Sequence, residues 1–489
     1  MSERPRAKKP NVKELNRKVM EDLDARKKQH PLALWQQEID RATDDLLCQQ
    51  AGVKAAWAQA KGGRRLEVAA ESVDAGGCVR VLVRGHGWGV ASFTRLDRLP
   101  DMIQAAEAAS RAVVLDEPIA LAPVEPRVDE VIPAIDGDPF EVPLAEKRRY
   151  LEGLNGLMLA ESGKIADTQS SYYDERTEWY FANSEGTWLH EVRPEIGVSA
   201  LATARDGDTI ERYHDGVGLR RGWRSVQGLE RLFSNAAGMA VKLLSAPAVK
   251  GGTYPVVLDP RLAGVFVHEA FGHLSEADFV YENPQAREMM TLGRRFGSDI
   301  VNIGDDGSAA GLRGTLPYDD EGTPTRNTRL IEHGILVGRL HSRETAAKMG
   351  EQPTGNARAI GFRFPPIVRM TNTYIEGGSG TFDDLIADIK LGVYALDMIG
   401  GQTFLENFSF SAAHGYMIRD GKVAEMVKDV VLAGNLFKSL QSIDRLAGDF
   451  RFNQMGGGCG KGGQSPLPVT EGAPHIRFAE LLVGGEVGG

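Results

Sequence analysis

The sequence predicts an α+β protein, with an N-terminal α/β region that contains antiparallel sheets and a C-terminal domain of mostly antiparallel, barrel-like β structure. Strand-like segments separated by Gly, Asn and Asp turns run through both halves, and amphipathic helices stand between them in the first half. The predicted divisions are a mobile basic arm at 1–30, an N-terminal region at 31–245 with a proline- and acid-rich linker at about 116–143, and a C-terminal domain at 246–489.

The bulk composition is that of a globular protein, since 42% of the 489 residues are hydrophobic, which is ample for a sizeable core. The formal net charge of −10 argues against a nucleic-acid binder, which needs a basic face to neutralise phosphates. No segment approaches the ~20 apolar residues of a membrane span, and the N-terminus lacks the apolar core of a signal peptide. We therefore expect a cytoplasmic protein with no nucleic-acid or membrane partner.

The elements expected before the linker are a helix, a hairpin and a second helix. Residues 32–50 place apolar side chains at helical spacing. Residues 78–93 alternate apolar and polar side chains, break at a Gly-His-Gly turn and resume, which is typical of a hairpin. The alanine-rich residues 99–114 predict a helix capped near Asp101.

Beyond the linker, residues 144–160 predict a helix and residues 164–215 predict antiparallel hairpins joined by Asn-Ser-Glu-Gly and Arg-Asp-Gly turns. A helix at 228–246 precedes a short strand at 254–258, which passes through Pro260 into another helix. The remaining residues are rich in Gly, Thr and β-branched side chains, and this favours a β-rich C-terminal domain.

The helix after Pro260 carries the motif HEAFGH, in which His268, Glu269 and His273 suggest a metal site. In the familiar His-Glu-x-x-His helix the two histidines diverge by about 40°, whereas a spacing of five turns them about 140° apart. Both can reach one ion only if the helix widens into a π turn or ends near Gly272, a residue that permits such a break. The alternative is two unrelated histidines beside a solvent-facing glutamate.

Cys459 is the second candidate for metal binding. The chain has only three cysteines, so a disulfide framework is excluded and a thiol or metal role is open. Cys459 lies in NQMGGGCGKGGQ, and glycines on both sides suit a metal ligand better than a core residue because they supply no packing. A phosphate-binding loop does not fit, since Met455 replaces the first glycine and Gly462 follows Lys461.

The motifs HEAFGH, DDEGTPTRNTRLIEHGIL, GNAR, RMTNTYIEGG and GGGCGKGGQ together resemble the TldD/PmbA family of metallopeptidases, over most of the chain. The resemblance implies that His268, His273 and Cys459 bind Zn²⁺ and that Glu269 is the catalytic acid and base. It also implies an α+β N-terminal region joined to a largely β C-terminal domain. A dimer is implied as well, either a homodimer or a heterodimer with a PmbA-like subunit that lacks the motif. The basic arm is a departure from the family pattern.

Three protein ligands leave one tetrahedral position open, which is the arrangement of a catalytic zinc rather than a structural one. We therefore expect a zinc-dependent peptidase that hydrolyses unfolded peptides or trims precursor peptides, with Glu269 as general base toward a metal-activated water. Two alternatives are a non-catalytic binding or scaffold subunit of a protease complex, and a metal-dependent amide hydrolase that acts on a small biosynthetic substrate.

The substrate is expected to bind as an added strand on an exposed sheet edge, for which residues 365–378 are the candidate. Most of the other histidines have no ligand spacing and are interpreted as structural. His341 and His414 are candidates for stabilising an oxyanion.

Overall fold

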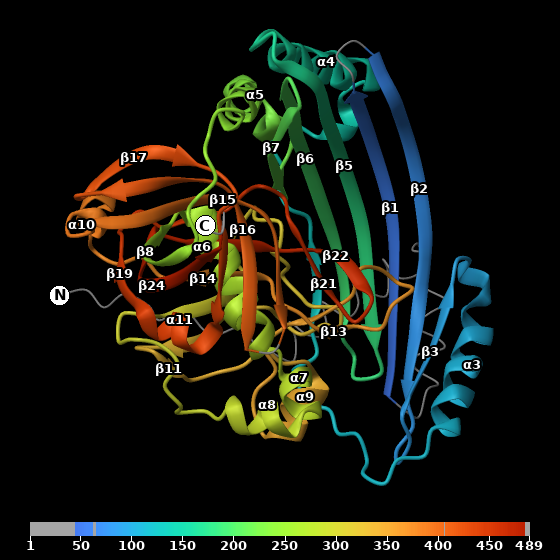
Figure 1. Ribbon diagram of the computed structural model, residues 1–489. Coiled ribbons are helices and arrows are strands. Elements are labelled where there is room, and N and C mark those ends of the chain that lie inside the picture. The colour runs from blue at the N-terminus through green and yellow to red at the C-terminus, as the bar shows by residue number, and fades with distance from the viewer. Residues whose placement is uncertain (1–44, 62–64, 405, 485–489) are drawn as a thin grey trace, which may run out of the picture.

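The computed structural model describes residues 45–61, 65–404 and 406–484 (Figure 1). The predicted basic arm at 1–30 and residues 32–44 of the first predicted helix lie outside this part of the chain. The described residues form a tall sheet of long strands and a compact C-terminal body beside it. The mixed α+β class predicted from the sequence is confirmed.

The tall sheet has seven strands in the order β3-β2-β1-β5-β6-β4, with β7 paired to β6. Its strands are β1 Asp45–Lys61, β2 Arg65–Leu82, β3 Trp88–Phe93, β4 Val128–Val131, β5 Ile165–Asn183, β6 Trp188–Asp206 and β7 Thr209–Leu219. All its pairings are antiparallel except that of β4 with β6. The hairpins predicted at 78–93 and 164–215 are therefore confirmed.

The prediction of a helix at 32–50 is wrong for residues 45–50, which begin strand β1. This strand pairs along its length with β2 on one side and β5 on the other. Apolar residues at helical spacing are a weak indicator of a helix by themselves. Here the pairing with β2 and β5 decides the conformation of residues 45–50 instead.

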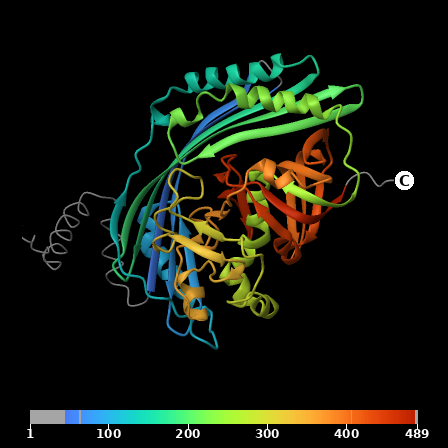
Figure 2. The same cartoon turned by 90° about the vertical axis from the view of Figure 1, so that its left-hand side faces the viewer.

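Three longer helices pack on the tall sheet: α3 Leu99–Ala112, α4 Leu144–Ala160 and α5 Glu230–Leu243. Helix α3 covers β2 and β3, and α4 and α5 share one apolar core with β5, β6 and β7. All three were predicted, although α3 begins after Arg98 without a side-chain cap rather than at a cap near Asp101. Figure 2 shows that the long strands arch over the C-terminal body.

The C-terminal body contains a closed five-stranded barrel in the order β15-β8-β24-β18-β16, because β15 also pairs with β16. Its strands are β8 Gly252–Leu258, β15 Leu391–Phe404, β16 Asn407–Arg419, β18 Val431–Asn435 and β24 Ile476–Gly484, with β17 Lys422–Val427 and β19 Ile443–Leu446 attached. The barrel-like C-terminal domain predicted from the sequence is thus confirmed.

A six-stranded sheet lies beside the barrel in the order β11-β10-β9-β14-β23-β20. The strands are β9 Ile303–Asp306, β10 Asn327–Glu332, β11 Ile335–Leu336, β14 Asn372–Ile375, β20 Arg451–Phe452 and β23 Thr470–Ala473. Strand β14 pairs with β9 on one side and β23 on the other, so the exposed edge predicted at 365–378 is wrong for this strand. Both its neighbours come from distant parts of the chain.

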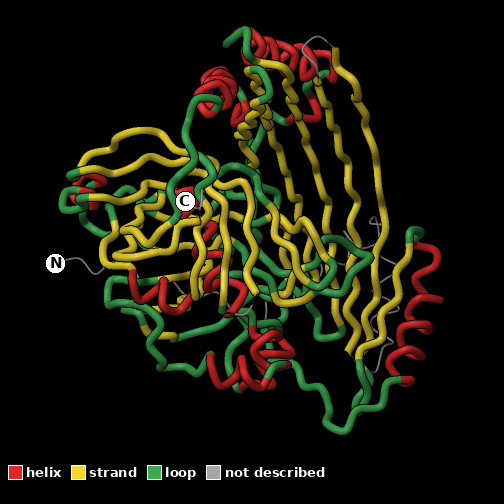
Figure 3. The backbone as a smooth tube through the Cα atoms, viewed as in Figure 1, coloured by secondary structure: helices red, strands yellow, loops and turns green. Residues whose placement is uncertain are grey.

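Two two-stranded sheets and several short helices complete the body. The sheets join β12 Ala357–Arg358 to β13 Ile367–Val368 and β21 Gly458–Lys461 to β22 Gln464–Pro468. The helices are α6 Pro260–Val267, α7 Ala277–Glu282, α8 Pro284–Met289, α9 Arg343–Met349, α10 Phe382–Ile386 and α11 Leu436–Ser442. Figure 3 shows that long strands dominate the tall sheet, whereas the C-terminal body combines strands with many loops and short helices. Among the described residues, no helix is long and apolar enough to cross a membrane.

Candidate metal centre

Helix α6 follows the barrel strand β8 and leads directly into the HEAFGH motif at residues 268–273. Asp259 is its N-cap and accepts a hydrogen bond of 2.9 Å from the backbone N–H of Leu262, and Pro260 occupies the first turn. After Val267 the chain forms a π-helix over His268–Gly272, in which the N–H of His273 donates to the carbonyl of His268. This is the widened turn that the five-residue spacing demands. The two imidazole rings consequently lie with centroids 5.2 Å apart.

Gly272 leaves space that a larger residue would fill. A Cβ atom at this position would lie 2.0 Å from Sδ of Met370, which is fully buried. The glycine therefore allows the π-helix to pack closely on the chain segment before β14, in addition to easing the break in the helix.

Cys459 reaches the same place from strand β21, near the C-terminal end of the chain. Its Sγ lies 3.2 Å from Nε2 of His273, and its carbonyl accepts a hydrogen bond of 2.7 Å from Arg369. One ligand atom each from His268, His273 and Cys459 lie within 4.8 Å of one another. Within the described ranges, no other group of three His, Cys, Asp or Glu side chains comes this close. The structure thus brings the three sequence-predicted ligands together.

A buried carboxylate orients His273. Oε2 of Glu276 lies 3.0 Å from Nδ1 of His273, so Nε2 is the ring nitrogen that faces Cys459. Nζ of Lys461 lies 3.1 Å from the same carboxylate oxygen. Burial by itself would raise the pKa of Glu276, but Lys461 and His273 hold it below its usual range. Burial would likewise lower the pKa of His273, but Glu276 and Cys459 raise it well above the usual range.

Sequence reasoning missed Glu276 and Lys461. Glu276 follows His273 by three residues, and a carboxylate at that distance from a ligand histidine is a readable indication of such a pair. Lys461 stands two residues after Cys459, on the same short strand.

His268 is buried, with an exposed fraction of 3%. Its Nδ1 lies 3.9 Å from Oε1 of Glu471, and it has no hydrogen-bond partner in the described structure. Burial, and then the charges of His273 and Arg369, lower the pKa of His268 well below its usual range. The ring is therefore neutral at pH 7, which is the form of histidine that binds metal.

Glu269 stands next to His268 in the chain and is half-buried. No hydrogen bond to its side chain is present among the described residues, so its carboxylate is available to a substrate or a water. Burial raises the pKa of Glu269; the positive charge of His273 opposes this and the negative charge of Glu276 adds to it. A carboxylate with a raised pKa is better suited to take up and return a proton.

The donor set fits zinc. Two imidazole nitrogens and a thiolate sulfur are preferred zinc ligands, and bonds of 2.0–2.3 Å at tetrahedral angles place such donors about 3.4–3.6 Å apart. Sγ of Cys459 and Nε2 of His273 are 3.2 Å apart, and the three ligand atoms lie within 4.8 Å of one another. Small movements of the side chains would bring these distances to the values for a tetrahedral zinc site. Nδ1 of His268 is buried and has no hydrogen-bond partner in the described structure. Buried polar atoms usually have a partner, so an unpaired nitrogen here is consistent with a site for a ligand such as a metal ion.

The two histidines proposed as oxyanion donors have other neighbours. Nδ1 of His341 lies 3.1 Å from Thr345 and Nε2 lies 3.1 Å from Glu351, so neither ring nitrogen is free to donate to a substrate. His414 is buried in β16, with Nδ1 3.9 Å from Asp397. The ring nitrogens of His341 are thus engaged by other side chains, whereas for His414 the role of oxyanion donor stays a prediction.

Comparison with known families matches three consecutive models to this chain. They are domain 1, the central domain and the C-terminal domain of the PmbA/TldA metallopeptidases, at residues 63–113, 137–245 and 251–485. The chain belongs to the PmbA/TldA metallopeptidase family. Residues 268–273 and Cys459 both lie within the match to the C-terminal domain.

Members of this family from distant organisms are similar over most of the chain. A metalloprotease of Synechocystis sp. is 46% identical over 423 residues, which cover 86% of this chain and 91% of that protein. A zinc metalloprotease TldD homolog of Saccharolobus solfataricus is 33% identical over 319 residues, covering 65% of this chain and 71% of the relative. A crystal structure of a candidate modulator of a DNA gyrase from Thermotoga maritima has the same fold, with a TM-score of 0.76 at 21% identity, covering 94% of this chain and all of that one.

Proposed function

We propose that this member of the PmbA/TldA family is a zinc-dependent peptidase that hydrolyses unfolded peptides or trims precursor peptides. The observation that carries the proposal is the meeting of His268, His273 and Cys459 beside Glu269, in a donor set that suits a catalytic zinc. The names of the similar proteins, a metalloprotease and a zinc metalloprotease, support it.

His268, His273 and Cys459 would hold the ion, and zinc in such a site supplies Lewis acidity that lowers the pKa of a water to about 7 and polarises a carbonyl group. Glu269 accepts the proton of the attacking water and returns it to the leaving amine. Glu276 keeps Nδ1 of His273 protonated, which directs the other ring nitrogen toward the ion.

Strand β21 offers an edge on which a peptide can bind as an added strand. Among the described strands it pairs only with β22, so its other side is not used in a ladder. Gly458 and Gly460 flank Cys459 on this strand and carry no side chains that obstruct a second backbone. A peptide bound on this edge would lie next to Cys459. Strand β14 cannot bind a peptide in this way, because β9 and β23 already pair with its two edges.

The test is the zinc content of protein purified without chelator, measured by elemental analysis on wild type, Cys459→Ala and Cys78→Ala. Cys78 is the matched control because it is equally buried but belongs to strand β2 of the tall sheet. We expect about one zinc per chain in wild type and Cys78→Ala, and a sharp loss in Cys459→Ala. Glu269→Gln is expected to keep its zinc and lose peptide cleavage.

Two results would contradict the proposal. Metal-free wild type, or zinc that does not depend on Cys459, would favour a non-catalytic binding subunit. Zinc-loaded protein that cleaves small amides but no peptide would favour an amide hydrolase of a biosynthetic pathway.

A further inference from the structure

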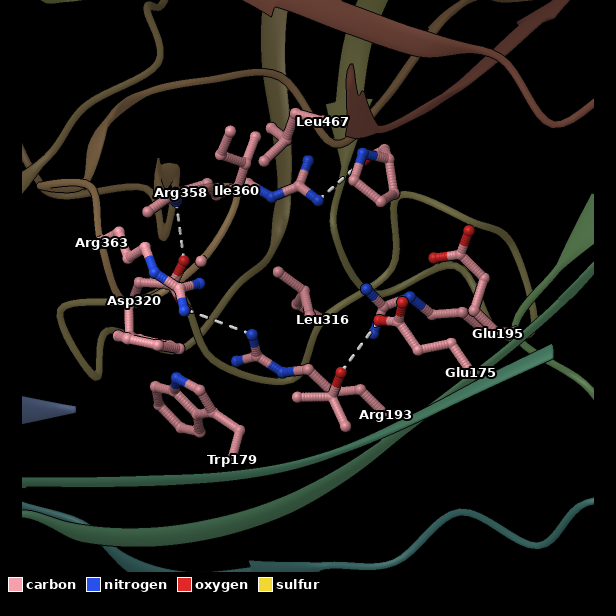
Figure 4. Close-up of a pocket in the computed structure, with 16 residues that line it drawn as sticks. Glu175, Trp179, Arg193, Glu195, Leu316, Asp320, Arg358, Ile360, Arg363 and Leu467 are labelled. Carbon is pink, nitrogen blue, oxygen red and sulfur yellow. Dashed lines mark hydrogen bonds and ion pairs between the residues drawn. The ribbon is translucent and has the colours of Figure 1, made fainter. Parts of the chain in front are cut away.

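A cavity of about 190 Å³ lies between the tall sheet and the C-terminal body. Strands β5 and β6 form one wall, and the loop at 358–363 and strand β22 form others (Figure 4). Four arginine side chains and three acidic ones line it, and the arginines are Arg193, Arg220, Arg358 and Arg363. Four arginines from three separate segments around a small cavity suggest a site for an anion.

The acidic side chains at the cavity are already neutralised in large part. Oδ1 of Asp320 lies 3.2 Å from Nη1 of Arg193, and Oε1 of Glu195 lies 2.7 Å from Arg313, which does not line the cavity. Burial and the neighbouring Glu195 raise the pKa of Glu175, which weakens its negative charge. Glu175, Glu191 and Glu195 act on Arg220 through their charges, but none of them forms an ion pair with it in the described structure.

Arg220 and Arg358 form no ion pair with any described carboxylate, and the hydrogen bonds that they donate within the described structure go to backbone carbonyls. Nε of Arg220 donates to the carbonyl of Arg313 at 3.0 Å, and Nη2 of Arg358 donates to that of Pro468 at 2.8 Å. Arg358 is 2% exposed, and its Nε has no hydrogen-bond partner in the described structure.

The two guanidinium groups also repel each other. Burial, and then the charge of Arg220, lower the pKa of Arg358 to about 9. Burial, and then the charge of Arg193, lower the pKa of Arg220. An anion between them would remove the repulsion and would supply the acceptor that a buried guanidinium requires.

The size of the cavity restricts the ligand. Sites for cofactors and drug-sized molecules usually have about 300–1,000 Å³, which is more than the 190 Å³ present here. A carboxylate with a few methylene groups fits, and its planar pair of oxygens matches the fork of a guanidinium. Apolar side chains of Trp179, Leu316 and Leu467 also line the cavity and suit the carbon atoms that carry such a carboxylate.

The cavity and the metal centre share the β21–β22 hairpin. Cys459 is directly opposite Leu467 in the hairpin register, and Leu467 lines the cavity. Cβ atoms of residues paired in this way are about 5 Å apart, and an extended peptide advances about 3.3 Å per residue. A group bound in the cavity is therefore within a few residues of a peptide bond placed beside Cys459.

We propose that this cavity binds a carboxylate of the substrate peptide through Arg220 and Arg358, and so selects which peptides are cleaved. The proposal rests on the proposed peptidase function. The carboxylate comes from the C-terminus of the peptide or from an Asp or Glu side chain near the cleaved bond, since both present the same group.

The test compares N-acetylated octa-alanine with a free C-terminus, the same peptide as its C-terminal amide, and amides with a single glutamate at each position in turn. With the zinc-loaded enzyme we expect kcat/KM to be about 10- to 100-fold higher for a carboxylate-bearing peptide than for the plain amide, as for a charge-assisted hydrogen-bonded pair. A preference for the free acid identifies the C-terminus as the source, and a preference for one glutamate amide identifies a side chain. Equal kcat/KM for all peptides would overturn the proposal.

The variants Arg220→Gln and Arg212→Gln complete the experiment. Arg212 is an exposed residue of β7 that does not line the cavity, so its variant is expected to keep the preference. Arg220→Gln is expected to lower kcat/KM for the preferred carboxylate-bearing peptide until it equals the value that the same variant gives for the plain amide. A preference that survives in Arg220→Gln would contradict the assignment, and the comparison of peptides on wild type decides the question if this variant does not fold.

The carboxylate site can also be tested if the protein turns out not to be a peptidase. If the wild type cleaves none of these peptides, their binding to it is measured by calorimetry. Tighter binding of carboxylate-bearing peptides that is lost in Arg220→Gln would still support the carboxylate site, and equal affinities, or no binding of any peptide, would overturn it.

Discussion

Glu276 and His273 are joined by a hydrogen bond of 3.0 Å between Oε2 and Nδ1, and the opposite ring nitrogen of His273 faces Cys459. Glu276 is 1% exposed and also lies 3.1 Å from Lys461. A buried carboxylate behind a ligand histidine fixes its tautomer and makes its other nitrogen a stronger ligand.

We predict that Glu276→Gln weakens zinc binding about 10- to 100-fold, the range for loss of such a partner. The measurement is competition with a chelator of known affinity. Asp278→Asn is the matched control, because Asp278 lies 2.6 Å from the same Lys461 but has no hydrogen bond to His273 among the described residues. Unchanged zinc affinity in Glu276→Gln would show that this contact does not orient His273.

The close packing at Gly272 gives a second prediction. Because a Cβ atom there would lie 2.0 Å from Sδ of Met370, Gly272→Ala must displace either the π-helix or the Met370 side chain. We expect a loss of about 1–3 kcal/mol in the free energy of unfolding, measured with urea, together with reduced zinc content. Gly156→Ala in α4 is the control, since a Cβ there meets nothing within 4 Å and helix propensity improves. Equal effects of the two substitutions would contradict the packing argument.

Asp259, the N-cap of α6, gives a prediction about pH. Burial, and then the charge of Asp397, raise the pKa of Asp259 from 3.8 to about 6. Between these values the folded chain holds a proton that the unfolded chain has released, so this residue lowers the free energy of unfolding as the pH rises from 3.8 to about 6. The slope is about 1.4 kcal/mol per pH unit.

Asp259→Asn removes that slope and keeps an acceptor for the N–H of Leu262. We therefore expect the stability of the variant, relative to wild type, to increase from pH 4 to pH 6 and to stay level above it. Urea unfolding at a series of pH values measures this, and Asp208→Asn, in an exposed turn, is the control. A constant difference between Asp259→Asn and wild type over this range would contradict the raised pKa.

Local patterns in the sequence predicted the elements that depend on local interactions. Helix α4 matches the predicted residues 144–160 because its apolar side chains repeat at helical spacing and Pro143 precedes it. The spacing of His268 and His273 predicts either a widened turn or a helix end near Gly272 if both bind one ion, and the structure has the first of these, a π-helix. Both features depend on residues that are close together in the sequence, so they can be predicted without knowing which distant segments pack against them.

The failures concern pairings between distant segments. Residues 45–50 became part of β1 because β2 and β5 pair with them, and β14 is enclosed because β9 and β23 flank it. The candidate ligand Cys459 was recognisable by its glycine neighbours, whereas the side chains around the carboxylate cavity come from segments that have no motif in common. Only the fold brings Arg220 and Arg358 to one place.

The final prediction concerns oxidation of Cys459. A cysteine that binds zinc does so as a thiolate, and thiolates are the form that peroxide oxidises to sulfenic acid, which thiols reduce again. We expect hydrogen peroxide to release zinc and stop peptide cleavage together, and dithiothreitol with added zinc to restore both. The zinc released is followed with a chromogenic chelator, and Cys78→Ala is the control because Cys78 lies in strand β2 of the tall sheet. Zinc release that requires Cys78, or peroxide inactivation with all the zinc retained, would show that Cys459 is not the sensitive ligand.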